Sequence, residues 1–568
     1  MVGDQDFSHM RIINRLVHKQ SCGMKFTRLL ASTGRTFLTL SYVEGSRDPP
    51  LSRLTLDQYF QTEILNKFGD RPALICPDEQ LRPYGGPESL NFRDRYLAWN
   101  FNELDRHISA LSRGLVSLGV RKGDRVAVIM GNNSAYAILQ WACARIGAVL
   151  VTMNPAYRAN EFVSALQLVE ASTLFIVPGL RNSNYISLLS SVIPSISSSS
   201  PANISSEALP YLRSLVVVNN SGKKGAFKEL LKPVKSAIDF RELFIWSTSV
   251  QDTYIKEVAK TMAHDETINL QFTSGTTGAP KAVSVPTHFL GILDEISKRG
   301  NIKLPKLRTG IAAGSSIPED LMRQLIDKLN LTQLTIAYGM TETSPVSFQT
   351  IPEDPLVKRI ETVGRVQPHV KAKIIDTEGN VVPVNTPGEL CVAGYLVQKG
   401  YWNAPAQTAS VMKRHPGSDV YVDLWMHTGD EAMMDKEGYL RIISRIKDII
   451  IRAGENLFPV QIENVITTHP SIREAAVIAV PDPIYGEVVG AWVVRNMQEI
   501  PVTRIELRKW VGRHMNPQNQ PSWLWFVGED NVEKELPKTA SGKVQKHILR
   551  RWGAKWASQG IGKVIDAL

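Results

Sequence analysis

The most informative segment of the chain is Thr273-Ser274-Gly275-Thr276-Thr277-Gly278-Ala279-Pro280-Lys281, which follows a short apolar segment, Ile268–Phe272, predicted to be a strand. Glycines let a backbone bend close to a ligand, hydroxyls add hydrogen-bond donors, and the closing lysine adds positive charge. This combination predicts a loop that holds a chain of phosphates. Pro280 separates the last glycine from the lysine, so the Walker pattern GxxxxGK[ST] is not met. A plain Gly/Thr turn is the alternative.

Composition indicates a globular chain with several folding units. The 568 residues are 43% apolar and 21% charged, and 65 Lys+Arg against 55 Asp+Glu give a net charge of +10. The cysteines lie far apart and lack both the CxxC pairs of a zinc site and the density of a disulfide scaffold, which favours a reducing compartment. They are Cys22, Cys76, Cys143 and Cys391.

Neither a membrane span nor nucleic-acid binding is expected. The most apolar stretch, Ala135–Met153, is interrupted by Gln140, Arg145 and Gly147, and it predicts a buried helix followed by a strand. The positive excess is modest, and no long basic run carries interleaved aromatic residues. A small polyanionic substrate is compatible with this charge.

Residues 1–36 are basic and contain Ser, Thr and Leu, which suits an organelle-targeting leader. Arg11-Ile12 followed by His18 nearly matches an N-terminal peroxisomal signal, although Lys19 stands where a small or aliphatic residue is expected. The segment therefore indicates a mitochondrial or peroxisomal location, or a cytoplasmic one if it is only a tail.

Alternating helix and strand patterns predict layered, largely parallel sheets. Asn102–Leu118 has helical apolar spacing, 121–124 is a turn, and Arg125–Met130 is a buried strand. The fold class is therefore α/β. The serine-rich segment 187–206 is expected to be a surface loop without a packed element.

The phosphate-loop segment resembles that of the adenylate-forming superfamily, which comprises acyl-CoA synthetases, adenylation domains and luciferases. The likeness reaches upstream to about residue 54 and is strongest to the medium-chain acyl-CoA synthetase family member 2 type, through Tyr42-Val43, Asn154–Tyr157 and Tyr338–Phe348. Further motifs follow in the superfamily's order: Tyr338-Gly339-Met340-Thr341-Glu342-Thr343, Pro387-Gly388-Glu389-Leu390, Gly400-Tyr401-Trp402, Thr428-Gly429-Asp430, Arg445-Ile446-Lys447-Asp448, Gly454-Glu455-Asn456, Pro459–Glu463 and Ser541-Gly542-Lys543.

The resemblance implies a role for each matching residue. Lys543, Thr341 and Glu342 would be catalytic, with Glu342 holding Mg²⁺, and Lys447 would be the hinge. Gly454 and Glu455 would contact coenzyme A. The nucleotide would be held by Thr273, Ser274, Gly275, Thr276, Thr277, Gly278, Lys281, Gly314, Ser315, Tyr338, Gly339, Asp430 and Arg445.

Single residues have plainer alternatives. Lys543 could be a solvated lysine, Asp430 a turn residue after a glycine, and Glu342 a helix-terminal carboxylate. The order of the motifs favours the functional roles. Activating a carboxylate with ATP accumulates negative charge, which a magnesium ion, loop donors and an ammonium would offset.

The resemblance also implies the domain organisation: a leader over 1–53, a large domain of layered α/β subdomains over 54–444, a hinge over 445–449, and a small mobile α+β domain over 450–568. Rotation about Lys447 would let one site serve two half-reactions.

The chain departs from the family after Lys281. Tyr338 follows Lys281 by 57 residues, several dozen fewer than the family places there. Val285–Phe289 already resembles a later family segment, and the aromatic-His motif of the acyl pocket is absent, with His288 only a doubtful substitute. Such a loss is expected to expose apolar faces and unpaired sheet edges. A compensating surface, a shortened transcript or a faulty gene model would explain it, and we favour the last two.

We therefore expect an ATP- and Mg²⁺-dependent acyl-CoA synthetase that activates a carboxylic acid, by default a medium-chain fatty acid, and transfers it to coenzyme A. The alternatives are adenylation for another thiol acceptor, activation of a pathway-specific acid in secondary metabolism, and a catalytically impaired nucleotide-binding protein. Oligomeric state is left open.

Overall fold

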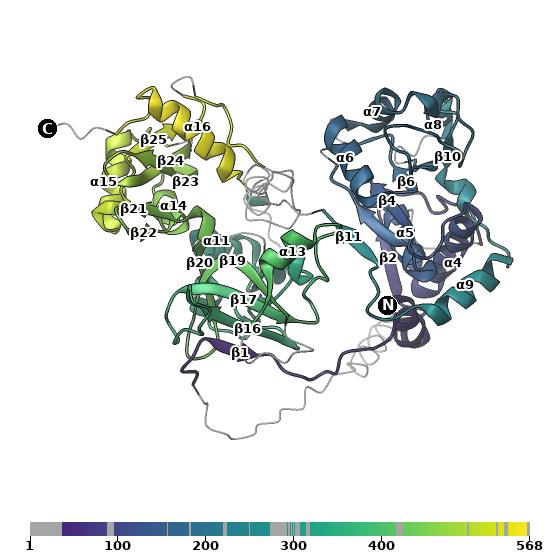
Figure 1. Ribbon diagram of the computed structural model, residues 1–568, viewed down its shortest axis with the longest axis horizontal. Helices are drawn as coiled ribbons and strands as arrows, with labels where there is room; N and C mark the ends of the chain where they lie inside the picture. Colours follow the sequence, from purple (N-terminus) through teal and green to yellow (C-terminus); the bar gives the residue numbers. More distant parts are fainter. Residues whose placement is uncertain are drawn as a thin grey trace, which may run out of the picture.

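The computed structural model describes residues 37–87, 96–155, 157–180, 183–219, 224–248, 250–272, 292–293, 296, 298, 300, 307–313, 319–415, 424–496, 499–529, 532–538 and 544–564. Four sheets of four or more strands organise these residues, and Figure 1 shows them in three bodies that follow one another along the sequence, except that the first strand of the chain joins the middle body. No helix in the described ranges is long and apolar enough to cross a membrane.

The N-terminal body is built on a six-stranded sheet in which every neighbouring pair is parallel. In pairing order the strands are β10 (Ala237–Asp239), β9 (Ser214–Val217), β6 (Thr173–Ile176), β4 (Arg125–Ile129), β5 (Val149–Thr152) and β11 (Asn269–Gln271). Around the sheet lie α4 (Phe101–Ser117), α5 (Ser134–Ile146), α6 (Ala159–Val169), α7 (Tyr185–Val192), α8 (Lys224–Leu231) and α9 (Val250–Thr261). This confirms the α/β prediction.

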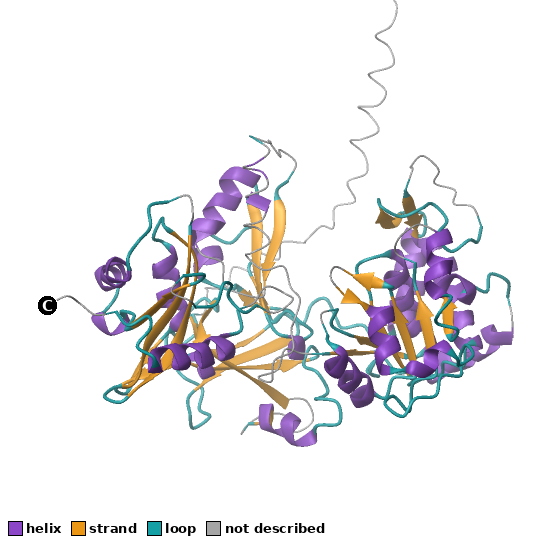
Figure 2. Cartoon of the chain, turned by 90° about the horizontal axis from the view of Figure 1, so that it is seen from above, coloured by secondary structure: helices purple, strands orange, loops and turns teal. Residues whose placement is uncertain are grey.

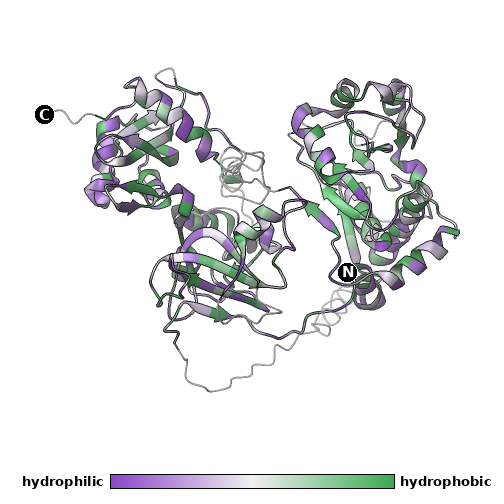
Figure 3. Ribbon diagram, in the orientation of Figure 1, coloured by the Kyte–Doolittle hydropathy of each residue, from purple (hydrophilic) through white to green (hydrophobic). Residues whose placement is uncertain are grey.

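Connection handedness explains the layers of this body. The chain moves from β4 to β5 through α5 and then returns across β4 to β6 through α6. Because parallel crossovers are right-handed, the two helices fall on opposite faces of the sheet. Accordingly α5 contacts α4 and α9, whereas α6 contacts α7. The apolar strands are buried between the layers, as Figures 2 and 3 show.

A short hairpin and small helices precede this sheet. The hairpin consists of β2 (Pro72–Cys76) and β3 (Leu97–Asn100), preceded by α2 (Leu56–Tyr59) and α3 (Asn66–Phe68). Asn100 caps α4 by accepting a hydrogen bond from the Glu103 amide, while the Glu103 carboxylate accepts one from the Asn100 amide.

One sequence prediction for this body is wrong. Residues 187–206 are not a surface loop, because they contain most of α7 and a 3₁₀ turn over Pro194–Ser197. Leu189, Ile193, Ile196 and Ile204 are buried in the main core. The serines occupy mostly the outer positions between these apolar residues, so a serine-rich composition coexists with a packed segment.

The middle body combines two sheets. The first is antiparallel and contains β1 (Tyr42–Glu44), β16 (Val370–Ile375), β17 (Gly388–Gly394), β19 (Leu424–Met434) and β18 (Met412–Arg414), with β20 (Leu440–Arg445) also paired to β19. The second contains β12 (Thr309–Ala313), β13 (Gln333–Tyr338), β14 (Phe348–Gln349) and β15 (Arg365–Val366), with α11 (Glu319–Leu329) and α12 (Leu356–Glu361). A third helix, α13 (Pro405–Val411), precedes β18.

The C-terminal body is a sheet with helices on both faces. Its strands are β22 (Glu455–Leu457), β21 (Ile450–Arg452), β24 (Gly486–Arg495) and β23 (Ile472–Asp482), with β25 (Trp523–Phe526) paired to β24. Helices α14 (Pro459–Thr467) and α15 (Arg504–His514) share one core cluster with the sheet, and α16 (Lys546–Ser558) shares another with Trp492 and Trp525. The predicted small α+β domain is therefore present.

His107 makes the N-terminal body sensitive to acid. It stacks on Trp99 with 3.9 Å between ring centroids, and its Nδ1 lies 2.7 Å from the Glu103 carbonyl oxygen. Burial lowers the pKa of His107 from 6.5 to about 4. Between these values the unfolded chain binds more protons than the folded chain, so stability falls as the pH falls.

We expect the free energy of local unfolding of α4 to fall by about 2 kcal/mol between pH 7 and pH 5, because unfolding exposes the His107 imidazole to protonation. Hydrogen exchange of the α4 amides at the two pH values measures it. A His107→Gln variant should show the smaller dependence, and an equal dependence in both proteins would contradict the assignment.

Candidate active site

Three sequence-predicted residues meet where β13 approaches β19. The hydroxyl of Tyr338 donates to Asp430 Oδ2 at 2.5 Å, and Arg445 Nε lies 2.6 Å from Asp430 Oδ1. Asp430 is 3% exposed, whereas half of the Arg445 side chain is accessible. One buried carboxylate is thus held between a phenol and a guanidinium, and the guanidinium also faces solvent.

Strand register brings Asp430 and Arg445 together, because they are directly opposite each other in the β19–β20 pair. Thr428–Asp430 form an irregular segment of β19, where its register with β17 shifts, and neighbouring groups fix this segment. Thr428 Oγ1 donates to the Leu390 carbonyl at 2.8 Å and accepts from the Asp430 amide at 3.1 Å. Gly429 has a φ of +68°, which disfavours a side chain at this position.

Glu342 lies in a short 3₁₀ turn, Thr341–Thr343, and is 4% exposed. The Tyr401 hydroxyl donates to its Oε1 at 3.1 Å, and the Glu342 carbonyl accepts from the Gln398 amide at 2.9 Å. Glu342 is therefore oriented by a second segment of the chain, residues 398–401, which precedes α13.

Gly339 allows this turn to close. A Cβ atom at this position would lie 1.7 Å from the carbonyl oxygen of Pro345, so no other residue fits without backbone movement. This is the physical reason for glycine between Tyr338 and the turn that carries Thr341 and Glu342.

The charges of the site reinforce one another. Burial and the neighbouring Asp430 raise the pKa of Tyr338 well above its ordinary value, so the phenol remains a donor. Burial alone lowers the pKa of Arg445, but Asp430 and other acidic neighbours raise it overall. Burial and Glu342 raise the pKa of Tyr401 to about 12. Both tyrosines therefore stay protonated at neutral pH.

The predicted hinge connects the middle and C-terminal bodies. Lys447 lies in the 3₁₀ turn Ile446–Asp448, between β20 of one sheet and β21 of the next. Arg550 of α16 donates to the Lys447 carbonyl and to Asp448 Oδ1, both at 2.8 Å. The C-terminal helix is thus attached to the hinge turn.

Gly454 and Glu455 lie away from the Asp430 cluster, in the β21–β22 hairpin. Ala453 and Gly454 form its two-residue loop, both with positive φ, of 50° and 86°. Glu455 begins β22 and is exposed. The structure therefore places these two residues at an accessible turn of the C-terminal body.

Several predicted site residues lie outside the described residues. Lys543 is flanked by Lys538 and Val544, which form an antiparallel bridge, and Lys538 pairs with Glu474 at 2.7 Å. His288 also lies outside them. The others are Thr273, Ser274, Gly275, Thr276, Thr277, Gly278, Lys281, Gly314 and Ser315.

Two supporting residues were missed as functional groups by the sequence analysis. Tyr401 orients Glu342, and Glu389 accepts a hydrogen bond from the Gly429 amide at 3.2 Å. Both residues belong to segments that resemble family motifs, which was the only indication in the sequence that they have a role. The motifs do not show which residues Tyr401 and Glu389 contact.

Comparison with known proteins agrees with this arrangement. Residues 62–288 and 283–402 match the AMP-binding enzyme family in two pieces, and residues 461–543 match the AMP-binding enzyme C-terminal domain. Acyl-CoA ligase SidI of Aspergillus fumigatus is 31% identical over 603 aligned residues, which cover 92% of this chain and 95% of that protein. Mitochondrial medium-chain acyl-CoA ligase ACSF2 of Danio rerio is 29% identical over 593, covering 90% of each.

Solved structures share the fold. The anthranilate CoA ligase AuaEII in complex with anthranoyl-AMP has a TM-score of 0.65 at 19% identity, covering 90% of this chain and 99% of that one. ATP-bound MatB from Rhodopseudomonas palustris has a TM-score of 0.58 at 20% identity, covering 81% and 94%. The chain therefore belongs to the AMP-binding enzyme family and is a ligase of the AMP-forming class.

Proposed function

We propose that the chain activates a carboxylic acid with ATP as an acyl-adenylate and transfers the acyl group to the thiol of coenzyme A. The observation that carries this proposal is the buried carboxylate of Asp430 between Tyr338 and Arg445. Its two oxygens are acceptors held in fixed positions by these neighbours. A carboxylate of this kind is suited to accept hydrogen bonds from the ribose hydroxyls of a nucleotide.

Glu342 is the proposed magnesium ligand. Mg²⁺ prefers hard oxygen ligands, usually one or two carboxylates together with phosphate oxygens and water. The buried, Tyr401-oriented carboxylate of Glu342 fits this role. A bound Mg²⁺ would neutralise charge on the phosphates, while Thr341 and the loop from Thr273 to Lys281 would supply further donors.

The second half-reaction requires the small domain to change position. We propose that residues 445–449 are the hinge between a large domain over 54–444 and a small domain over 450–568. We also propose that a leader lies within residues 1–53, before β1, because β1 pairs with β16 of the large domain. Rotation at Lys447 would withdraw Lys543 and bring Gly454 and Glu455 to coenzyme A. The bonds from Arg550 to the hinge turn hold one of the two arrangements.

The acyl site is the incomplete part of the proposed enzyme. The alignment with SidI spans 603 positions, more than the 568 residues of this chain, so it contains gaps in this sequence. The family match is also split, with its two pieces meeting at 283–288. Among the described strands β12 is a sheet edge, and its Ile311 is 56% exposed. These observations support a missing segment after Lys281.

The acid is proposed by similarity. The name of the ACSF2 relatives specifies medium-chain substrates and mitochondria, and the SidI relatives are named acyl-CoA ligases. A medium-chain fatty acid and a mitochondrial location are therefore our first proposals. A pathway-specific acid, a different thiol acceptor or a peroxisomal location comes second.

A panel of acids tests the substrate and the acceptor together. Purified full-length chain is incubated with ATP, Mg²⁺ and each acid, with and without coenzyme A, and products are identified by mass spectrometry. The proposal expects acyl-AMP without coenzyme A and acyl-CoA with it. Adenylate that accumulates equally in both arms would exclude coenzyme A as the acceptor.

Glu342→Gln is expected to raise the Mg²⁺ concentration for half-maximal adenylation by well over tenfold, because an amide cannot replace an anionic ligand. Tyr401→Phe keeps the Glu342 carboxylate but removes the hydrogen bond that orients it, and this variant should raise the required Mg²⁺ concentration by about tenfold. Pyrophosphate release is measured across a Mg²⁺ titration. An unchanged titration curve in Glu342→Gln would remove this residue from the metal site.

A further inference from the structure

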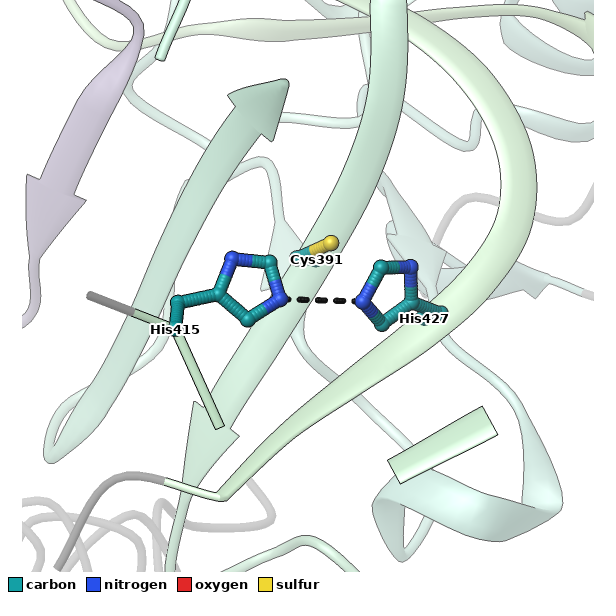
Figure 4. Close-up of side chains that lie close together, drawn as sticks. All are labelled: Cys391, His415 and His427. Carbon is teal, nitrogen blue, oxygen red and sulfur yellow. Dashed lines mark hydrogen bonds between the residues drawn. The ribbon is translucent and has the colours of Figure 1, made fainter. Parts of the chain in front are cut away.

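Three potential metal ligands converge from neighbouring strands of the antiparallel sheet. Cys391 of β17 and His427 of β19 are directly opposite each other in the register, and His415 follows β18, which pairs with the other side of β19. One ligand atom of each lies within 4.8 Å of the other two. Figure 4 shows the two imidazole rings facing each other with the Cys391 side chain beside their contact.

Hydrogen bonding fixes how His427 presents its nitrogens. Its Nδ1 lies 2.8 Å from Glu389 Oε2, and a carboxylate can only accept, so Nδ1 carries the proton. When the ring is neutral, its Nε2 is the unprotonated nitrogen and carries a lone pair that can bind a metal. It lies 2.9 Å from Nε2 of His415. A carboxylate–histidine pair of this kind orients metal-bound imidazoles in many proteins.

The ligand set selects the ion. One thiolate and two imidazoles suit a borderline transition metal, and Zn²⁺ binds such sets in tetrahedral geometry. Around Zn²⁺ two imidazole nitrogens would be about 3.3 Å apart, so the histidines need to separate by only a few tenths of an ångström. We propose that Cys391, His415 and His427 bind Zn²⁺, with water as the fourth ligand and Glu389 supporting His427.

The charges around this Cys391–His415–His427 site are compatible with a cation. A Cys391 thiolate and the Glu389 carboxylate together balance two positive charges. Lys373 and Lys413 are opposing positive groups near the site. The Lys373 ammonium lies over the Trp425 ring at 4.1 Å, where the ring offsets part of its charge, and Lys413 is exposed to solvent. Cys391 is fully buried, which keeps bulk water from the sulfur.

Glu389 connects the Cys391–His415–His427 site to the proposed nucleotide site. Glu389 binds His427 with Oε2 and the Gly429 amide with Oε1, and Gly429 immediately precedes Asp430. A metal ion that fixes His427 would therefore also stabilise the irregular segment of β19 that carries Asp430. The metal proposal itself does not depend on the ligase activity.

Cobalt is the probe, because Co²⁺ occupies zinc sites and its spectrum reports the ligands. The full chain is freed of metal with a chelator and titrated with Co²⁺. We expect one equivalent to produce ligand-field bands of tetrahedral intensity and a thiolate-to-cobalt charge-transfer band, both abolished by one equivalent of Zn²⁺. Wild-type protein without the charge-transfer band would overturn the proposal and leave a metal-free hydrogen-bonded histidine pair.

Variants assign the ligands. Cys391→Ser should lose the charge-transfer band, and His415→Asn should weaken Co²⁺ binding at least tenfold. Cys143→Ser is the matched control, since Cys143 is also a buried free cysteine but lies in α5. A band that survives Cys391→Ser contradicts the site. If that variant fails to fold, unchanged Co²⁺ affinity in His415→Asn contradicts it instead.

Discussion

Lys543→Ala is expected to reduce acyl-adenylate formation by at least about a hundredfold, because the lysine ammonium is proposed to stabilise charge at the α-phosphate in the transition state. The thioester step, started from supplied acyl-adenylate and coenzyme A, should change by less than about threefold, because the proposed rotation at Lys447 would withdraw the lysine before that step. The two half-reactions are measured separately, by pyrophosphate release and by acyl-CoA formation.

Lys538→Ala is the matched control. Lys538 lies five residues before Lys543 in the sequence, but its ammonium forms an ion pair with Glu474. A partly exposed pair contributes little, so this variant should keep both half-reactions within about threefold. Equal losses in both steps for Lys543→Ala would contradict a role confined to adenylation.

A family-like segment inserted between Ser284 and Val285 is expected to raise acid-dependent pyrophosphate release strongly and to raise the melting temperature by roughly 5 °C or more. The reason is that the proposed missing segment would contain the wall of the acyl site, and that Ile311 on β12, an edge among the described strands, is exposed. Added strands would pair with this edge and cover its apolar surface. Activity and thermal unfolding are compared between the two proteins.

A Gly/Ser segment of the same length at the same position is the control, because it adds chain without apolar faces or strand propensity. It should leave activity and melting temperature unimproved. If the natural chain equals the protein with the restored segment in both activity and melting temperature, the shorter chain is a tolerated specialisation. In that case the expectation that the missing segment impairs the enzyme is wrong.

Local pattern and motif order predicted much of the fold. The helix and strand expected within Ala135–Met153 are α5 and β5, and the strand expected within Arg125–Met130 is β4. Asp430 and Arg445 were both predicted to lie at the nucleotide site, and the structure places their side chains in contact. These successes have a physical cause, since hydrophobic periodicity acts locally and motif residues occupy fixed positions in a sheet.

Contacts set by register could not be predicted. The pairing of β17 with β19 shifts between Glu389 and Cys391, and such an irregularity re-aims side chains. In a regular strand, successive side chains point to opposite faces of the sheet. That rule applied to the sequence does not predict that Glu389 contacts both His427 and Gly429. His415 belongs to no motif at all, so the Cys391–His415–His427 site becomes visible only when three strands are placed together.

The prediction of a surface loop over residues 187–206 was wrong for a different reason. The average composition of this serine-rich segment is too polar for a core, but Leu189, Ile193 and Ile196 recur at helical spacing and are buried. Burial follows the spacing of apolar residues more closely than their proportion.

Calorimetric titration of ATP into the full chain, with Asp430→Asn measured in parallel, tests the nucleotide site most directly. Asparagine keeps the size of the side chain but replaces one acceptor oxygen by a donor. The proposed site predicts saturable ATP binding by the natural chain and at least tenfold weaker binding by the variant, both measured at a temperature where the two proteins are folded. No ATP binding by the natural chain, or equal affinity in the two proteins, would contradict it.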